Sequence, residues 1–549
     1  MGWLGSFLLP ISGVHRIAIR SSTAQDKRVL LRGSTPPAAV RCAITAPKAH
    51  LPRRQNLDRN SRLAVTWIPS KNGRRTLIRP GERGLLLLSL GILAFLLLMT
   101  YVFSKLYWNR TGNRGPLTSD CTLYASPLGN NGNSGTSPSS PKSFSGAASA
   151  TVPGSVVCLL GGTYQLNSSF KPPNSGSPLS WIVYKSYGDG PVNFLWNGPT
   201  DASSMFDMHG GAFPSKPAYL EFRGLNLDGR GSAADGFFCR GSHHLRFIGN
   251  SISNTGGSGI ASIDCDYLTV DHNLIHHNGY LPSETAVPSD YGWTSGISLN
   301  STRWFDAYPG FHNVVSGNVV AGEYDGSSHH SDGNGIILDL SNGTYDYHSA
   351  NTPPALIVNN VVYGNGGRCI VAYVVANFWI VNNTCYKNNL DPELQNAGSL
   401  ASSDSVDGYF INNIAVVWNS SHLPFEQRNS NSNISYYSNM YFGGSNNFLP
   451  ADSSQLILAD PLFLRPPMID PALPGAYAVV PHPSLLGNGL TLSPSSPAIG
   501  SGIDPATLPK LPSPLVEDLK KSIYSDIKGD RRRPGGPFDL GAYQSHQMP

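Results

Sequence analysis

The stretch ALIVNNVV (residues 355–362) alternates apolar side chains and then breaks at a pair of asparagines, and this pattern decides the fold. The same register recurs in LRFIGNSI, LTVDHNLI, HNVVSGNVV, FWIVNNTC and GYFINNIA, and ISYYSNMY follows in phase. The shared asparagines are Asn250, Asn273, Asn318, Asn360, Asn383, Asn413 and Asn439, spaced by 23, 45, 42, 23, 30 and 26 residues. Self-similarity at this period indicates a solenoid. The strand-like alternation and the β-branched residues predict a parallel β-helix.

Stacked coils of such a solenoid lie about 4.8 Å apart, so each asparagine is expected to hydrogen-bond to its copies in neighbouring coils. The short spacings fit one coil, and the two long ones fit one coil plus roughly 20 inserted residues. We predict these inserts at residues 279–311 and 322–331. Because the two inserts leave neighbouring coils, they are expected to converge over one groove.

Charge is distributed unevenly along the 549 residues. Residues 1–83 hold 16 Lys and Arg against 3 acids, whereas the remainder holds 23 against 32. Residues 84–104 carry no charge, and at about 1.5 Å per residue they can cross a bilayer core of about 30 Å. Lys105, Tyr107 and Trp108 then form an interfacial edge. The basic flank places the N-terminus in the cytoplasm and the solenoid in the periplasm or outside the cell.

The sequence therefore divides into five predicted segments. Residues 1–83 are basic, rich in proline and without periodicity, which predicts a disordered cytoplasmic tail. A single transmembrane helix follows at residues 84–107, then a linker at 108–119, the β-helix at 120–445 and a loop-rich capping segment at 446–549. We see no nucleic-acid-binding fold in the tail, and we expect a monomer.

Six of the seven cysteines fall into neighbouring pairs in the predicted exterior part. They predict three disulfides: Cys121–Cys158, Cys239–Cys265 and Cys369–Cys385. The 26-residue gap between Cys239 and Cys265 matches one coil, which would stack their side chains. Six cysteines allow about fifteen connectivities, so other pairings stay open. No Cys-x-x-Cys motif is present, which disfavours a zinc site.

Both ends of the predicted β-helix resemble known proteins. DCTLYASPLGNNGNSGTSPSSPKSF (residues 120–144) and VPGSVVCLLGGTYQL (residues 152–166) resemble the N-terminal end of secreted right-handed parallel β-helix proteins, including family-9 pectate lyases. SPSSPAIGSG (residues 493–502) and DIKGDRRRPGGPFDLGAYQ (residues 526–544) resemble the closing segment of bacterial surface β-helix proteins. The resemblance implies an all-β, right-handed parallel β-helix whose open apolar end is covered by a polar cap.

The densest polar cluster is GEYDGSSHHSDGNGIILDLSNGT (residues 322–344). Its residues 331–339, together with residues 358–368, are similar to a bacterial β-helix family with polysaccharide-degrading members. The similarity singles out His330, Asp332 and Arg368. An arginine can pair with a uronate carboxylate, and a histidine can remove the proton beside it. Arg368 and His330 are therefore predicted in these roles, with Asp332 orienting the histidine.

The leading interpretation is thus a polysaccharide lyase-like enzyme acting on acidic glycans. A glycoside hydrolase would instead need two carboxylates about 5–9.5 Å apart, and Asp325, Asp332 and Asp339 are the dense source of such a pair. The rival to the lyase interpretation is a surface protein that binds glycans or shapes the envelope without cleaving its ligand, and the glycoside hydrolase ranks third.

Side chains around this cluster could bind sugar. The candidates are His329, Asp271, and the aromatic residues Tyr291, Trp293 and Trp304, with Tyr308 beside them. The aromatic side chains could equally form a lid that packs on the solenoid. The family-9 resemblance also raises calcium, because Ala-Asp-Gly-Phe at residues 234–237 matches its motif and points to Asp235. The next coil, at residues 254–259, lacks the aspartates of that motif, so no metal ligand set is assigned.

Overall fold

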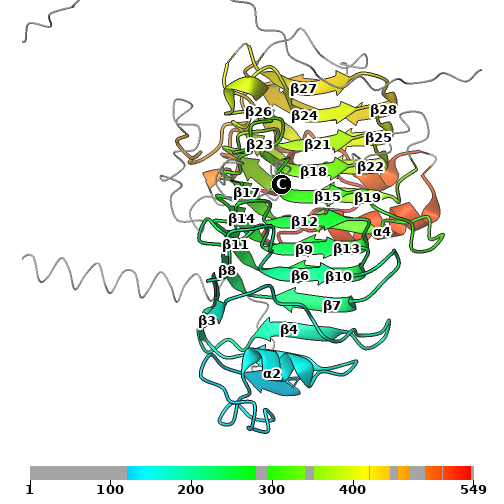
Figure 1. Ribbon diagram of the computed structural model, residues 1–549. Coiled ribbons are helices and arrows are strands. Elements are labelled where there is room, and N and C mark those ends of the chain that lie inside the picture. Colours follow the sequence, from blue (N-terminus) through cyan, green and yellow to red (C-terminus); the bar gives the residue numbers. More distant parts are fainter. Residues whose placement is uncertain are drawn as a thin grey trace, which may run out of the picture. The chain divides into compact units, whose positions relative to one another are not determined.

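The computed structural model describes residues 120–279, 293–340, 351–419, 421–444, 456–469, 489–509 and 511–545. Within these residues the strands form three parallel sheets, here called A, B and C, with 11, 11 and eight strands. From β4 to β27 each coil contributes one strand to sheet A, one to sheet B and one to sheet C, and the next coil repeats the order (Figure 1). The predicted parallel β-helix is therefore confirmed.

Sheet A consists of β1 (Leu123–Ala125), β2 (Val156–Leu159), β4 (Ile182–Ser186), β7 (Ala218–Arg223), β10 (His243–Ile248), β13 (Asp266–Asp271), β16 (Asn313–Ser316), β19 (Ala355–Val358), β22 (Ala376–Val381), β25 (Val406–Ile411) and β28 (Ser432–Tyr437). Sheet B consists of β3 (Gly162–Leu166), β5 (Val192–Trp196), β8 (Asn226–Asp228), β11 (Ser251–Ser253), β14 (Leu274–His276), β17 (Val319–Ala321), β20 (Val361–Tyr363), β23 (Thr384–Tyr386), β26 (Ile414–Val416), β29 (Asn439–Phe442) and β30 (Leu456–Leu458). Sheet C consists of β6 (Phe206–His209), β9 (Phe237–Arg240), β12 (Ile260–Ile263), β15 (Ser295–Asn300), β18 (Asn334–Asp339), β21 (Ile370–Tyr373), β24 (Gly398–Ser403) and β27 (Leu423–Arg428).

The corner between sheets A and B explains the sequence repeat. The residue before each repeated asparagine has a positive φ, for example 61° at Gly249, 62° at Gly317 and 58° at Asn359. Glycine and asparagine adopt this left-handed conformation more readily than other residues. The recurring Gly-Asn and Asn-Asn pairs are thus the residues that a tight corner requires.

The seven asparagines form one continuous column in the interior of this corner. Each side-chain Nδ2 donates to the Oδ1 of the next asparagine at 2.9–3.1 Å, from Asn250 to Asn439. Each Oδ1 also accepts the backbone N–H of the preceding asparagine in the column. All seven side chains are buried. The predicted stacking of these amides is confirmed.

A short helix covers the N-terminal end of the stack. Helix α2 (Phe144–Ser149) lies across the first coils (Figure 1) and buries Ala147 and Ala148 in the core. The Phe144 ring packs 4.4 Å from the ring of Phe170 and 5.0 Å from that of Phe194, measured between centroids. The resemblance implied a cap over this end, and the structure places helix α2 there, with Ala147 and Ala148 packed on the core.

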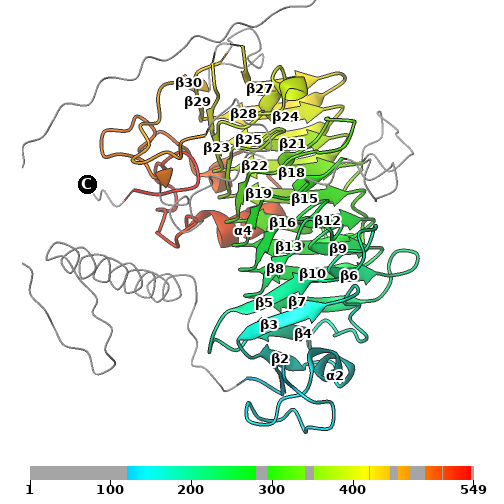
Figure 2. The same ribbon diagram turned by 60° about the vertical axis from the view of Figure 1, so that its left-hand side comes forward.

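The described C-terminal residues lie along the flank of the solenoid, whereas the sequence predicted a capping segment. Helix α4 (Ser513–Ile523) lies beside β16 and β19 (Figure 2) and buries Leu519 and Ile523 against outward side chains of sheet A such as Trp379. Ahead of it stands the short 3₁₀ helix η5 (Pro505–Thr507). Leu540 and its neighbours pack on sheet B. The parallel ladder also continues to β30, beyond the predicted boundary at residue 445.

All three predicted disulfides are present: Cys121–Cys158, Cys239–Cys265 and Cys369–Cys385. The stacking argument for one of them was wrong. Cys239 lies opposite Ser262 in sheet C, and Cys265 follows three residues later, at the turn towards sheet A. The second bond therefore ties a strand to the next corner.

The long coils differ from the prediction. The predicted insert at residues 279–311 contains β15, whose Ile297 and Leu299 belong to the core. The extra residues of this coil are thus divided between the B–C corner before β15 and the C–A corner after it. In the next coil the additional residues are likewise divided, with 12 between β17 and β18 and 15 between β18 and β19. Each long spacing therefore comprises two longer connections, because both coils still supply a strand to sheet C.

The predicted cytoplasmic tail, transmembrane helix and linker, at residues 1–119, lie outside the described residues. Among the helices that the structure does describe, none has the length and apolarity needed to cross a membrane.

Candidate functional site

Asp325, His330 and Asp332, three of the residues singled out by the sequence, lie at the corner between sheets B and C. Four successive coils turn there through residues 322–333, 364–369, 387–397 and 417–422. Parallel stacking places these connections one above another, so residues far apart in sequence become neighbours.

A second amide column runs through this corner. It consists of Asn278, Glu323, Asn365 and Asn388, each five residues after a member of the first column. Asn278 Nδ2 donates to Glu323 Oε1 at 3.1 Å, and the Glu323 backbone N–H donates to Asn365 Oδ1 at 2.9 Å. Glu323 is buried, and its Oε2 has no hydrogen-bond partner in the described part of the chain. Burial raises the pKa of Glu323 to about 8, against the hydrogen bonds from Asn278.

Asp325 shapes the turn that carries the predicted catalytic residues. Its Oδ1 accepts the backbone N–H of Ser327 at 3.1 Å, and its Oδ2 accepts those of Ser331 and Asp332 at 3.2 and 3.3 Å. Its side chain is buried. Asp325 was predicted as a catalytic residue, but these contacts give it a positioning role.

Asp332 stands just before β18, and its side chain is half-buried among other charged groups. Asn334 Nδ2 donates to its Oδ1 at 2.7 Å. Burial raises the pKa of Asp332 to about 7, and the negative charges of Asp339 and Asp325 add to the effect, against the positive charge of Arg368. A carboxyl with this pKa can hold a proton near neutral pH and release it to a substrate.

Asp339 ends the same strand on the outward face of sheet C. Ile336 and Leu338 of β18 belong to the core, so alternation turns Asp339 away from it. Asn300 Nδ2, on the neighbouring β15, donates to Asp339 Oδ2 at 2.9 Å. The two carboxyls of Asp332 and Asp339 lie close enough for one charge to affect the protonation of the other.

His330 is oriented by a residue that the sequence did not indicate. Its Nδ1 lies 2.9 Å from Oδ2 of Asp391, not against Asp332 as predicted. The imidazole is 38% exposed, whereas the Asp391 side chain is 1% exposed. Asp391 also binds the Tyr324 hydroxyl and caps the 3₁₀ helix η1 (Pro392–Leu394). Because an ionised carboxylate only accepts hydrogen bonds, this contact favours the tautomer with the proton on Nδ1, and Nε2 is then the nitrogen that can act as a base.

The Arg368 guanidinium faces Glu426 of the protein itself, which does not support its predicted contact with a substrate carboxylate. Its Nε lies 3.9 Å from Glu426 Oε2, and its side chain is 12% exposed. Its terminal Nη1 donates to the Ser331 carbonyl at 3.4 Å, so it buttresses the turn before Asp332. Glu426 in turn contacts Arg428 and accepts the Gly398 N–H at 2.8 Å.

The predicted sugar-binding residues separate into different places. Trp293 and His329 stack at 4.1 Å between ring centroids, and Trp293 is 51% exposed, so they form one surface pair before β15 and β18. Trp304 lies at the C–A corner, where it lines a different pocket of about 350 Å³ with Asp306 and Pro309. Tyr291 lies outside the described residues.

Asp271 also lies away from the cluster. It ends β13 in sheet A, accepts from Ser316 Oγ at 2.5 Å and contacts His272 Nδ1 at 2.8 Å. His272 hydrogen-bonds to the backbone of Ile527, in the C-terminal segment. The predicted role of Asp271 in the groove is therefore not supported, because it belongs to the opposite corner of sheet B.

Asp235 holds neighbouring coils together. Its Oδ2 accepts from Ser204 Oγ at 3.0 Å, and its Oδ1 accepts the Ser258 N–H at 2.8 Å. Within the ranges that the structure describes, no three His, Cys, Asp or Glu side chains are placed to hold a metal ion. A calcium site at Asp235 stays a prediction that these contacts do not favour.

The comparisons with known proteins agree on the architecture. Residues 209–339 match the family described as "Right handed beta helix region". This match and the three parallel sheets define a right-handed parallel β-helix protein. A search of curated proteins found no match.

Several solved structures resemble the chain at low identity. Pectate lyase Pel9A is 18% identical over 78% of this chain and 97% of its own, with a TM-score of 0.36. A protein titled "Glycoside hydrolase" is 10% identical over 59% of this chain and 94% of its own, with a TM-score of 0.44. PfbA, a surface adhesin of Streptococcus pneumoniae, is 12% identical over 56% and 75%, with a TM-score of 0.38. Likenesses this distant carry no argument about activity.

Proposed function

We propose that this chain hydrolyses a polysaccharide at the corner of sheets B and C. The observation that carries the proposal is the half-buried carboxyl of Asp332, which Asn334 holds by a hydrogen bond beside the charges of Asp339, Asp325 and Arg368. Paired carboxyls with different environments are the requirement of glycoside hydrolysis. Asp332 gives its proton to the glycosidic oxygen as that bond breaks. Asp339 takes a proton from the water whose oxygen bonds to the freed anomeric carbon.

The charge around the cluster favours hydrolysis over the predicted lyase chemistry. Arg368 faces Glu426, and Asp325, Asp332, Asp339 and Asp391 surround the turn. An acidic polymer would be repelled by whichever of these carboxyl groups is ionised, and Arg368 is already engaged by Glu426. A neutral polysaccharide encounters no such barrier.

Replacement of Asp332 by asparagine is expected to lower the rate of hydrolysis roughly 10²- to 10⁴-fold, because the amide cannot donate a proton to the leaving group. The same change is expected to raise stability near pH 8, where the native carboxyl is half-buried beside like charges. Wild-type activity should fall as pH rises above about 7, the pKa of Asp332. Reducing-end release from xylan, glucan and mannan measures the rate, and urea unfolding measures the stability.

Asp407→Asn is the matched control, because Asp407 is exposed in sheet A. Equal activity of wild type and Asp332→Asn on every polymer that the wild type cleaves would reject the assignment.

A second candidate is β-elimination, which the His330–Asp391 pair favours. His330 Nε2 would take the proton beside a uronate carboxylate, and the bond to the next sugar would break to leave a double bond. Incubation with pectate, alginate and glycosaminoglycans, followed by absorbance of the unsaturated product, separates the two reactions. Product that vanishes in His330→Ala and persists in Asp332→Asn selects elimination.

We also propose that residues 84–107 anchor the chain in a membrane, with the β-helix on the periplasmic or extracellular side. The three disulfides support this, because such bonds persist in oxidising compartments. The full chain is expected to stay in the membrane pellet after alkaline carbonate extraction. A variant with Leu96→Arg and Leu97→Arg should be released, since each central charge opposes insertion by about 3 kcal/mol. Release of the unmodified chain would contradict the anchor.

A further inference from the structure

A pocket lies directly beside the candidate site, between the B–C connections of two successive coils. It is lined by Asn389, Leu390, Gln395, Trp418, Asn419 and His422, and its volume is about 320 Å³. Leu390 immediately precedes Asp391, the partner of His330. A polymer lying along this corner could therefore reach the pocket and the candidate site together.

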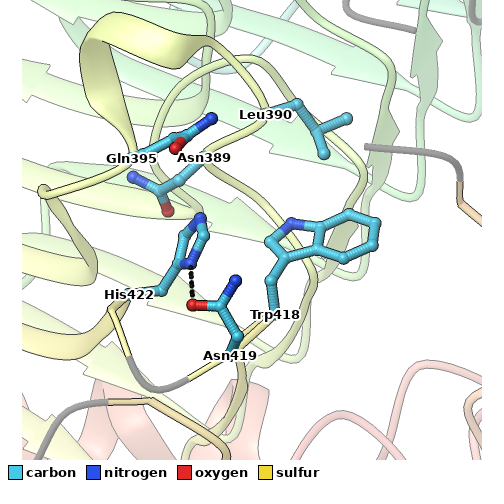
Figure 3. A pocket seen from close by; sticks show the side chains of 6 residues that line it. All are labelled: Asn389, Leu390, Gln395, Trp418, Asn419 and His422. Carbon is cyan, nitrogen blue, oxygen red and sulfur yellow. Dashed lines mark hydrogen bonds between the residues drawn. The ribbon is translucent and has the colours of Figure 1, made fainter. Parts of the chain in front are cut away.

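One wall of the pocket offers an unused hydrogen-bond acceptor. Asn389 Nδ2 donates to the carbonyls of Leu394 and Ala397 at 3.1 and 3.2 Å, which fixes the amide. Its Oδ1 is buried and has no partner within the described residues. Figure 3 shows this oxygen on the side of the amide that faces His422. A buried acceptor without a partner carries a penalty that a ligand hydroxyl can relieve.

The opposite wall is a fixed indole. Figure 3 shows Trp418 across the pocket from Asn389 and His422. Trp418 Nε1 donates to the Asn388 carbonyl at 3.0 Å, and the Lys387 ammonium lies 4.9 Å from the centroid of the ring. A ring held in this way binds without losing much rotational freedom. Aromatic walls with a few placed polar groups are typical of small-molecule sites of roughly 300–1,000 Å³.

The lining carries no formal charge near neutral pH. Burial lowers the pKa of His422, against a hydrogen bond to the Asn389 backbone, and its Nδ1 lies 3.2 Å from Asn419 Oδ1. The remaining lining residues are amides, a leucine and a tryptophan. The Lys387 ammonium is not among the lining residues, and it already lies against the rings of Tyr386 and Trp418. A carboxylate placed here would therefore lose its hydration without gaining an ionic partner from the lining.

We propose that this pocket binds one uncharged sugar unit of a polysaccharide, with its apolar face towards Trp418 and a hydroxyl donating to Asn389 Oδ1. The exposed Gln395 amide supplies a further contact at the rim. The pocket thereby selects a neutral unit next to the bond at Asp332. The choice of a sugar as the ligand rests on the proposed function, whereas the lack of charge on that ligand follows from the lining alone.

The test is binding of xylohexaose, cellohexaose, mannohexaose and hexagalacturonate to the full chain carrying Asp332→Asn, measured by calorimetry. At least one neutral hexasaccharide is expected to bind. Trp418→Ala should then weaken its binding about 10-fold or more, since an aromatic contact and its buried area are lost. Gln395→Ala should weaken it by a smaller factor. Because Gln395 is exposed, this second variant keeps the fold. Trp304→Ala, in the other pocket, is the matched control and should bind as before.

Affinity that is unchanged by both Trp418→Ala and Gln395→Ala would overturn the assignment, as would binding of hexagalacturonate alone or of none of the four. Binding of a neutral hexasaccharide that depends on Trp418, in a wild-type chain that cleaves no polymer, would uphold the pocket and reject the proposed hydrolysis.

Discussion

Replacement of Asn360 by alanine is expected to lower the free energy of unfolding by about 3–6 kcal/mol. Asn360 Nδ2 donates to the Val315 carbonyl and to Asn383 Oδ1, and its Oδ1 accepts the N–H of Asn318, each at 2.9–3.0 Å. The alanine leaves these buried groups without partners, at about 1–3 kcal/mol for each unsatisfied group. The missing volume adds a cavity at the middle of the column.

Urea unfolding of the full chain measures this loss. Hydrogen exchange shows which coils are destabilised. Because each coil of a solenoid contacts mainly its neighbours, the loss of protection is expected to stay near Asn360. The backbone amide of Asn318 is expected to lose protection first, because its acceptor is Asn360 Oδ1. Asn167→Ala is the control, since Asn167 is exposed just after β3. Equal unfolding midpoints for Asn360→Ala and Asn167→Ala would show that the column does not stabilise the stack.

Replacement of Glu323 by glutamine is expected to remove a pH dependence of stability of about 4–5 kcal/mol. The pKa of Glu323 rises from 4.5 to about 8 on folding, because the carboxyl is buried in the second column. The folded state therefore prefers the proton more than the unfolded state does. The native contribution is full below pH 4.5 and is lost progressively as pH rises towards 8. Glutamine keeps the acceptor for Asn278 and cannot ionise.

The measurement is the difference in unfolding free energy between Glu323→Gln and the wild type from pH 4 to pH 9. It should grow in favour of the variant up to pH 8 and then level off. Glu517→Gln, at an exposed position of α4, is the control and should leave the pH profile unchanged. Parallel pH profiles for Glu323→Gln and the wild type would mean that the carboxyl ionises freely in the fold.

The fold was predictable because its signal is repeated. Seven copies of one corner gave the register, and the left-handed residue before each asparagine limited what could stand there. The second column was not predicted, because a glutamate, Glu323, stands at one of its four positions. The residues around Asn278, which follows two histidines, also do not recur in the other coils. The signal of the second column was its offset of five residues from the first column.

The candidate site was only partly predictable. The motif at residues 322–344 correctly placed His330 and Asp332 in one turn, because they are close in sequence. Their decisive neighbours come from other coils: Asp391 stands 61 residues after His330, and Glu426 stands on β27 beside Arg368. Which of these side chains meet depends on the length of each B–C connection. That length differs between coils and leaves no periodic trace in the sequence.

The corners of the solenoid differ in how much change they can absorb. Two residues separate sheets A and B in coil after coil, as between β10 and β11 or between β22 and β23, whereas the turn from sheet B to sheet C ranges from six residues, between β11 and β12, to 18, between β14 and β15. The asparagine corner thus keeps a constant length and fixes the register of successive coils, whereas the B–C corner tolerates changes in length and sequence. New loops grafted between sheets B and C should change what the surface recognises while the spiral keeps its pitch.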